Sequence, residues 1–159
     1  MKVREVMQTD VKVLHPSDSL LTAAKRLAEH GIGGMPVCDP SGALQGVITE
    51  YDILEAMKTQ HKTLKMLMPP QISFGISFVE VLEDREAAKA FEEIGARPVS
   101  EVMTRDVAWV GADEKVERAI QIMVKRNVHR LPVVEHGKVV GVLTRGDVLK
   151  GFFRSLPEK

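Results

Sequence analysis

Two stretches of the chain carry apolar residues with the spacing of one buried helical face. Apolar side chains recur at i, i+3, i+4, i+7 and i+8 with polar residues between them, which predicts two amphipathic helices. Gly31 and Asn127 follow the two stretches, and both residue types readily take the left-handed conformation that ends a helix. Ser17 and Asp113 precede them at matching positions and are predicted to cap the helix N-termini. The apolar positions are Leu20, Ala23, Ala24, Leu27 and Ala28 in one stretch, and Val116, Ala119, Ile120, Met123 and Val124 in the other.

Short apolar runs on both sides of each helix predict strands. Residues 11–14 and 107–110 precede the helices as apolar runs bounded by polar residues. After each helix, two further apolar runs are separated by turn residues, at 39–42 and 135–137, and this predicts a hairpin. A last helix is predicted to begin at Thr49 and end near Met57, and its counterpart to begin at Thr144 and end near Phe153. The element order is therefore strand, helix, strand, strand, helix, and it occurs twice.

The two sets of elements are copies of one unit. A shift of 96 residues places Glu-Val-Met at 5–7 on Glu-Val-Met at 101–103, and Met-Pro-Val at 35–37 on Leu-Pro-Val at 131–133. After the hairpin turn the shift is 95, and it places Gly-Val-Ile-Thr-Glu-Tyr-Asp at 46–52 on Gly-Val-Leu-Thr-Arg-Gly-Asp at 141–147. The sequence predicts a mixed α/β (α+β) fold of two β-α-β-β-α repeats, at 1–57 and 98–155. We expect the two sheets to pack face to face with pseudo-twofold symmetry, because one repeat alone buries too little apolar surface.

Residues 58–97 match neither copy and form a central insertion. Pro69-Pro70 ends any helix that enters it, and residues 72–78 alternate apolar and polar positions around Gly75, which predicts an edge strand or an extended crossing. Residues 83–94 carry an apolar face that predicts an amphipathic helix.

Composition excludes several classes of protein. The chain has 159 residues with 22 basic and 22 acidic side chains, and this zero formal charge argues against a protein that binds nucleic acid or an anionic membrane. No apolar run approaches the roughly 18 residues of a membrane helix. The single cysteine, Cys38, cannot form an internal disulfide, and a cytoplasmic protein is expected. Five histidines and Cys38 lack metal-ligand spacing, and no nucleophile–base pair is visible, so neither a metal site nor an enzyme is predicted. Trp109 lies in a predicted strand and is expected in the core.

A Thr-x-x-Asp motif stands where the last strand of each repeat turns into a helix. Thr49 and Asp52 form it in the first copy, and Thr144 and Asp147 in the second. A helix N-terminus attracts phosphate, a Thr hydroxyl can donate to a phosphate oxygen, and an Asp carboxylate can accept two hydrogen bonds from a cis-diol. Gly46 and Gly141 would let a flat ring approach the strand. The same pattern is also a variant of the capping box, which contributes stability alone, and the motif leaves the two interpretations about equal.

A pair of cationic residues occurs in the second copy only. His129-Arg130 precedes the strand at 131–133, where the first copy has Gly33-Gly34. Arg offers a planar fork that suits phosphate, and His adds a donor whose charge varies near neutral pH. The alternative is a favourable interaction of these cations with the C-terminal end of the preceding helix.

Three motifs recur in both repeats: Val-Met near the start, an apolar-Pro-Val strand, and a Gly-x-apolar-Thr-x-x-Asp ending. Together they resemble a tandem pair of cystathionine β-synthase (CBS) domains, a Bateman module. The resemblance covers residues 1–57 and 98–153. It implies a sensor of adenosine-containing ligands in which Asp52 and Asp147 hold ribose hydroxyls, and Thr49, Thr144, His129 and Arg130 meet phosphate. It also implies adenine slots, whose lining residues would be Val11, Val107, Met35, Pro36, Leu131 and Pro132.

The sequence therefore predicts a regulatory module without catalytic activity that binds AMP, ADP or ATP between its repeats and signals to an effector protein by conformational change. No cofactor is required. A sensor of S-adenosylmethionine or NAD is one alternative, and a dimerisation or interaction scaffold with vestigial ligand sites is another. The resemblance also implies a homodimer, predicted to pair through apolar residues of the last helices, namely Ile53, Leu54, Met57, Val148, Leu149 and Phe152.

Overall fold

The computed structural model describes residues 1–60, 89 and 92–157, and its contacts divide the chain into two compact units. Unit 1 consists of Met1–Val13, Cys38–Leu44 and Asp106–Lys159, and unit 2 of Leu14–Val37 and Gln45–Arg105. Each unit contains most of one sequence repeat together with the opening segment of the other repeat. The repeat boundaries at 1–57 and 98–155 describe sequence similarity, and as domain boundaries they stay a prediction.

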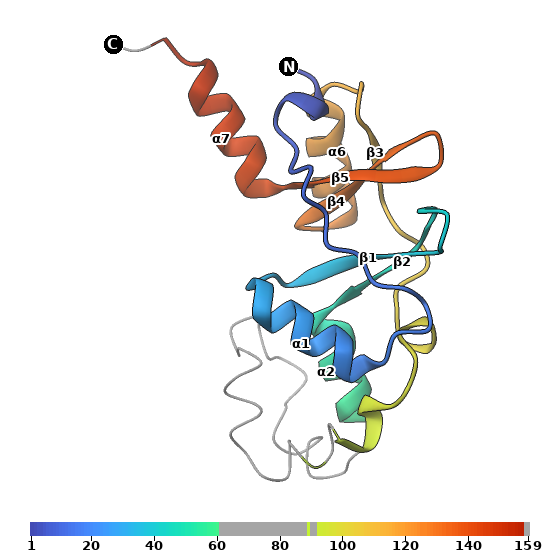
Figure 1. Cartoon of the computed structure of the whole chain (residues 1–159). Helices are drawn as coiled ribbons and strands as arrows, with labels where there is room; N and C mark the ends of the chain where they lie inside the picture. Colours follow the sequence, from blue (N-terminus) through green and yellow to red (C-terminus); the bar gives the residue numbers. More distant parts are fainter. Residues whose placement is uncertain (61–88, 90–91, 158–159) are drawn as a thin grey trace. The chain divides into compact units, whose positions relative to one another are not determined.

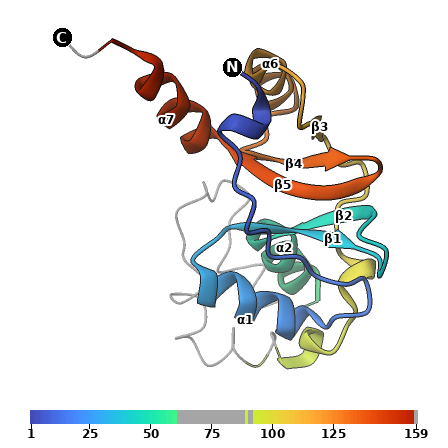
Figure 2. The same cartoon turned by 45° about the horizontal axis from the view of Figure 1, so that its top comes forward.

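Unit 2 is built around a two-stranded hairpin. Strand β1 (Gly34–Cys38) pairs with β2 (Leu44–Thr49), and helices α1 (Leu20–His30) and α2 (Glu50–Gln60) cover the same face of this hairpin (Figures 1 and 2). A short 3-10 helix, η2 (Val99–Glu101), follows the insertion. The core of unit 2 is formed by side chains from all of these elements, among them Leu20, Leu27, Met35, Ile48, Ile53, Met57 and Val99.

Unit 1 has the same arrangement with one more strand. Strand β3 (Val110–Gly111) runs parallel to β4 (Arg130–Glu135), which pairs antiparallel with β5 (Lys138–Thr144). Helices α6 (Val116–Arg126) and α7 (Arg145–Ser155) pack on this sheet, and the 3-10 helix η1 (Val3–Glu5) adds Val3 to the core. In Figures 1 and 2, the C-terminal end of α7 extends away from α6. The core includes Val3, Val116, Met123, Leu131, Leu143 and Val148.

The helices, hairpins and left-handed helix ends predicted for the two repeats are confirmed, but Ser17 and Asp113 are not the N-caps. Gly31 and Asn127 both adopt the left-handed conformation, with φ of 60° and 50°. The N-cap of α1 is Ser19 rather than Ser17, because the Ser19 side chain accepts the N–H of Thr22 at 3.1 Å. Helix α6 has no side-chain cap, since Asp113 instead accepts two hydrogen bonds from Arg4 at 2.9 Å.

The first strand of each repeat is shorter than predicted. Of residues 11–14 only Leu14 pairs, in a single parallel bridge with Val37, and of residues 107–110 only Val110 lies in a strand. Trp109 precedes β3 and is 51% exposed, so its expected place in the core is wrong. Cys38 is buried in β1 as expected, and burial raises the pKa of its thiol.

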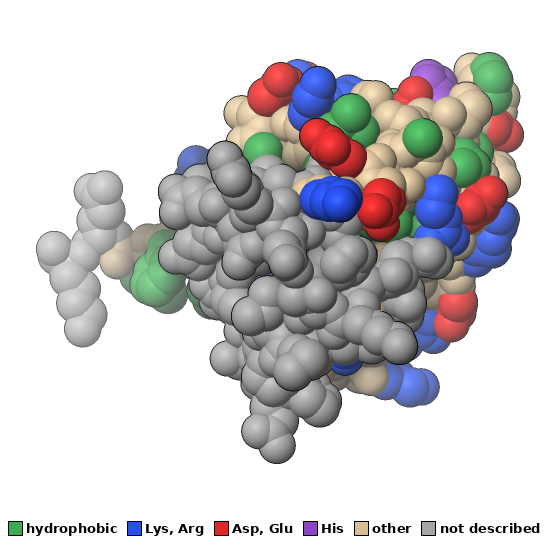
Figure 3. Space-filling view, turned by 90° about the horizontal axis from the view of Figure 1, so that it is seen from below, with side chains coloured by type: hydrophobic (Ala, Val, Ile, Leu, Met, Phe, Trp, Pro, Cys, Tyr) green, Lys and Arg blue, Asp and Glu red, His purple; other side chains and the backbone are tan. Residues whose placement is uncertain are grey.

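The predictions for the insertion fall largely outside the described residues. Pro69-Pro70 and the alternating stretch at 72–78 lie there, and of the helix predicted at 83–94 the structure describes residues 89 and 92–94, which are helical. Within the described part of the chain, no helix is long and apolar enough to cross a membrane, and no three His, Cys, Asp or Glu side chains are grouped to hold a metal ion. On the face drawn in Figure 3, acidic and basic side chains of the described residues are interspersed.

Candidate functional site

In unit 2, the Thr-x-x-Asp motif forms a complete capping box at the start of α2. The Thr49 N–H and the Thr49 hydroxyl both donate to Asp52 Oδ2 at 2.9 Å, and the Asp52 N–H donates to Thr49 Oγ1 at 3.1 Å. The second carboxylate oxygen, Oδ1, accepts the Thr104 hydroxyl at 3.3 Å. Burial raises the pKa of Asp52, and the hydrogen bonds from Thr49 and Thr104 offset this effect only in part. Any further hydrogen-bond donor that a ligand supplies therefore stabilises the charged form of Asp52.

In unit 1, Thr144 and Asp147 form the same capping box at the start of α7. The Thr144 N–H and hydroxyl donate to Asp147 Oδ2 at 2.9 and 2.7 Å, and the Asp147 N–H donates to Thr144 Oγ1 at 3.2 Å. The side-chain amide of Gln8 donates to both carboxylate oxygens, at 3.0 and 3.1 Å. Asp147 is only 8% exposed, which is unusual for an acidic residue.

The capping box that the Thr-x-x-Asp motif could form is therefore present in both copies. A Thr hydroxyl has a single proton, and in each copy that proton is donated to the neighbouring Asp. A hydrogen bond from Thr49 or Thr144 to a phosphate requires the hydroxyl to rotate away from Oδ2. The Oδ1 atoms take no part in the capping boxes: Oδ1 of Asp52 accepts the Thr104 hydroxyl, and Oδ1 of Asp147 accepts the Gln8 amide, which also contacts Oδ2.

The space beside Gly46 and Gly141 is occupied by the chain itself. A Cβ atom on Gly46 would lie 2.7 Å from Met103 Sδ, and one on Gly141 would lie 2.7 Å from Met7 Sδ. The absence of a side chain thus admits a methionine of the opening segment to each strand. The expectation that these glycines leave room for a flat ring is wrong for the structure described.

Sequence reasoning missed two residues of the site, Gln8 and Thr104. They directly follow Met7 and Met103 and correspond to each other under the same shift of 96 residues. Each pairs its backbone with a strand that leads to a Thr-x-x-Asp motif, Gln8 with Val142 and Thr104 with Val47. The repeat comparison could have identified both, because it places a polar residue at the same step after Met in each copy.

Unit 1 brings His129 and Arg130 close to its capping box. Arg130 is the register partner of Thr144 in the pairing of β4 with β5, and the Arg145 N–H donates to the His129 carbonyl at 3.1 Å. The equivalent bond in unit 2 joins the Glu50 N–H to the Gly33 carbonyl at 3.0 Å. Residues with basic side chains therefore meet in the backbone pairing at the start of α7, whereas two glycines and an acidic residue occupy the same places in unit 2.

The residues predicted to line adenine slots are divided between the units. Met35 and Pro36 belong to unit 2, and Leu131, Pro132, Val11 and Val107 to unit 1. Met35 and Leu131 have no exposed surface and belong to the hydrophobic cores, so neither side chain is accessible to a ligand in this structure. Val11 and Val107 are half-buried. The place of these residues in adenine slots stays a prediction.

Comparison with known proteins identifies the family. The model of the CBS domain matches residues 3–59 and 99–154. The chain belongs to the CBS domain family. Among its relatives, the uncharacterized protein MJ1426 of Methanocaldococcus jannaschii is 29% identical over 152 residues, which are 94% of this chain and 90% of MJ1426. The L-aspartate semialdehyde sulfurtransferase of the same organism is 27% identical, but the match covers 23% of its length, so its activity is not attributed to this chain.

Two solved structures of CBS proteins contain adenosine compounds. CBSX2 from Arabidopsis thaliana in complex with AMP is 26% identical with a TM-score of 0.69, and the match covers 96% of both chains. The CBS domain pair of protein MJ0100 in complex with 5'-methylthioadenosine and S-adenosyl-L-methionine is 27% identical with a TM-score of 0.67, over 96% of this chain and 99% of that one. The mixed α/β fold with small sheets is therefore that of CBS pairs, and the predicted family is confirmed.

Proposed function

We propose that this chain is a regulatory module that binds an adenosine-containing ligand, with AMP, ADP and ATP as the expected compounds, and that catalyses no reaction. The observation that carries the proposal is the state of the two capping-box aspartates. In each, the Oδ1 atom is held by a neutral donor, Thr104 in unit 2 and Gln8 in unit 1. A ribose cis-diol supplies neutral donors of the same kind, so it can replace these partners while Oδ2 keeps the capping box. The bound AMP and S-adenosylmethionine in related CBS pairs support this ligand class.

Phosphate recognition is assigned to His129 and Arg130 with the Thr144 hydroxyl. Arg130 lies opposite Thr144, and the guanidinium can bind a phosphate with two parallel hydrogen bonds. Since Gly33 and Gly34 stand at the equivalent positions of unit 2, the second repeat is the one that selects a phosphorylated ligand. An S-adenosylmethionine or NAD sensor is the alternative within the same class.

Isothermal titration calorimetry with AMP, ATP and S-adenosylmethionine tests the proposal. Asp52→Asn and Asp147→Asn keep an oxygen for the capping box but replace the carboxylate that receives the diol. Hydrogen bonds to a charged group are worth about 1.5–3 kcal/mol, so each variant should weaken its own site by roughly 10–100-fold. Asp39→Asn, in the hairpin turn, is the matched control and should bind as the unaltered chain does.

A scaffold with vestigial sites gives the opposite result. No heat should then be detected with any of the three compounds at millimolar concentration, while Asp147→Ala should still lower the melting temperature because it removes half of the capping box. A nucleotide hydrolysis assay should detect no turnover.

When a ligand is present at 100 times its Kd, the bound conformation gains about 2.7 kcal/mol, which is sufficient to change the state that an effector protein reads.

The proposed assembly is a homodimer that pairs through α7. Part of the predicted surface is wrong, because Ile53, Met57 and Val148 are buried in the unit cores. The exposed apolar residues of this helix recur instead at i, i+3 and i+4, and a twofold dimer needs one such self-complementary stripe. The stripe consists of Leu149, Phe152 and Phe153, and the exposed Leu156 directly follows the helix. Phe153→Asp should give monomers in analytical ultracentrifugation, and the neighbouring control Arg154→Ala should not.

A further inference from the structure

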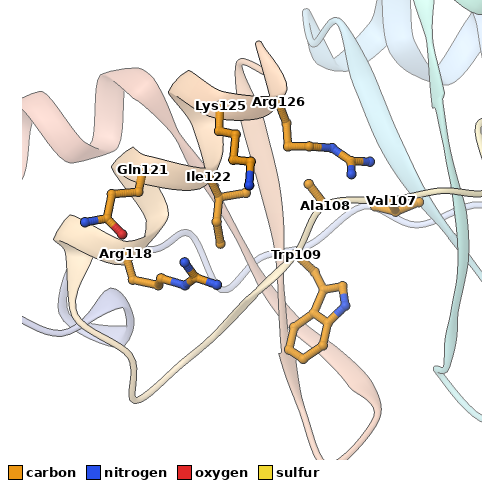
Figure 4. Close-up of a pocket in the computed structure, with 8 residues that line it drawn as sticks. All are labelled: Val107, Ala108, Trp109, Arg118, Gln121, Ile122, Lys125 and Arg126. Atoms are coloured by element: carbon orange, nitrogen blue, oxygen red, sulfur yellow. The ribbon is translucent and has the colours of Figure 1, made fainter.

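A pocket in unit 1 is lined by none of the capping-box residues. It has a volume of about 400 Å³ and is formed between the outer face of α6 and the segment that leads into β3 (Figure 4). A volume of this size is typical of small-molecule sites. The pocket is lined by Val107, Ala108, Trp109, Arg118, Gln121, Ile122, Lys125 and Arg126.

The pocket exposes the one tryptophan of the chain. Trp109 is 51% exposed, although a side chain of this size loses much free energy when its ring faces water. Ile122 on α6 and Ala108 beside Trp109 add further apolar surface, and Figure 4 shows Ile122 pointing from α6 toward the segment that carries the indole. The wall of the pocket therefore suits a flat apolar group that stacks on Trp109.

The polar part of the pocket is cationic and incompletely neutralised. Arg126 is held by Asp106, with an Nη2 to Oδ2 distance of 2.7 Å. Arg118 is 3.8 Å from Glu114, beyond hydrogen-bond distance, and its side chain is 60% exposed. Lys125 has no ion pair within the part of the chain that the structure describes. Arg118 and Lys125 are seven residues apart on α6, so they lie two turns apart on one face of the helix.

We propose that this pocket binds a small planar aromatic anion, whose ring stacks on Trp109 and whose acidic group lies between Arg118 and Lys125. The stacked ring gains apolar burial, and the anion gains from two cations that lack a full partner. A neutral aromatic compound lacks the attraction to the two cations, and a non-aromatic anion lacks the stacking on Trp109. Of the twelve residues predicted for the adenosine sites, only Val107 lines this pocket, so binding here does not depend on Asp52 or Asp147.

The single indole N–H provides a direct measurement. In a ¹H–¹⁵N correlation spectrum of the full chain, the Trp109 Nε1–H gives the only indole peak, and its shift is followed during titration. The probes are 2-naphthoate, an aromatic carboxylate, and AMP, an aromatic phosphate, each tested against Asp52→Asn/Asp147→Asn protein as well. Cyclohexanecarboxylate and adenosine are the matched controls that lack the ring or the charge. A shift with one probe or both identifies which anion the pocket prefers.

The proposal predicts a saturable shift of the indole peak with at least one aromatic anion and none with the two controls. Arg118→Glu and Lys125→Glu should each weaken binding at least about fivefold, whereas Arg154→Glu on α7 should not change it. In calorimetry, Trp109→Leu should abolish binding of the same probe. The proposal is overturned if neither anion shifts the peak, if cyclohexanecarboxylate or adenosine shifts it equally, or if the shift disappears in the Asp52→Asn/Asp147→Asn protein.

Discussion

Replacing Gly141 by Ala tests how the opening segment packs on the strand before α7. The new Cβ would lie 2.7 Å from Met7 Sδ and 2.9 Å from the carbonyl oxygen of Gln8. The methionine side chain can move, but the carbonyl is fixed, because it accepts the Val142 N–H at 3.0 Å. A retreat of the carbonyl weakens this hydrogen bond, which is worth about 1 kcal/mol, and overpacking adds about 1–3 kcal/mol. An alanine in a strand otherwise gains about 0.5–1 kcal/mol over glycine. The expected net loss is about 1–3 kcal/mol.

The stability of Gly141→Ala is measured by urea unfolding, followed by the fluorescence of Trp109, which reports unit 1, and by circular dichroism. A loss of this size lowers the melting temperature by roughly 2–4 °C per kcal/mol for a chain of this length. Gly146→Ala is the matched control. Its Cβ would meet nothing closer than 3.7 Å, and alanine is favoured over glycine in a helix by up to about 1 kcal/mol, so this variant should be more stable.

A second variant separates the two contacts of the new Cβ. Met7→Ala combined with Gly141→Ala removes the sulfur contact but leaves the carbonyl of Gln8 in place, so only part of the loss should be recovered relative to Met7→Ala alone. If Gly141→Ala is as stable as Gly146→Ala, the segment at 1–8 does not lie against β5, and the described position of Gln8 at Asp147 is wrong with it.

Three further predictions test individual features. Val3→Ala should cost about 1–3 kcal/mol in unit 1 because Val3 is fully buried, whereas Lys2→Ala, exposed beside it, should cost far less in the same urea titration. Gly31→Ala should cost about 1–2 kcal/mol because the φ of Gly31 is 60°. Asn127→Gly should cost nothing, since glycine tolerates the φ of 50° at the end of α6. A Gly31→Ala variant as stable as the unaltered chain would contradict the left-handed helix end. The pKa of Asp52 is raised above 3.8 by burial, so the folded chain binds this proton more tightly than the unfolded chain does. The stabilising effect of this proton is present below pH 3.8 and is lost as the pH rises through the pKa of Asp52 in the folded chain. The stability of the unaltered chain relative to Asp52→Asn should therefore fall as the pH rises through this range. A rise would contradict the assigned burial.

The elements of this fold can be predicted from the sequence because burial fixes the spacing of their apolar residues. The face of α6 that packs on the sheet includes Val116, Ala119 and Met123, as the periodicity indicates, whereas Val124 at the last predicted position is 75% exposed. The end of α6 needs a positive φ, which restricts the residue to a few types, and Asn127 is one of them. A capping side chain is less restricted. Ser17 and Ser19 are both compatible with the start of α1, and the hydrogen bond from Thr22 decides for Ser19.

The site is predicted less completely because it depends on contacts between segments far apart in the chain. Thr144 and Asp147 are recognisable as a motif, but nothing local indicates that the amide of Gln8 lies on the carboxylate. The exposure of Trp109 is equally non-local. A strand over residues 107–110 would bury it, but of these residues only Val110 pairs with β4, and those before it lie outside the sheet. Periodicity cannot show where a strand loses its partner.

The sequence also does not show which opening segment packs on which repeat. This pairing matters for how a ligand could signal. Both opening segments carry Glu-Val-Met followed by a polar residue, so either segment fits either repeat by pattern alone. In the structure, Gln8 from the first repeat lies on Asp147 of the second, and Thr104 from the second lies on Asp52 of the first. Under the proposed function, a diol that took Oδ1 of Asp147 would displace Gln8 and so act directly on the chain that leads into the first repeat. A ligand on one repeat would then change the constraints on the other through the covalent chain, without a separate relay of side chains.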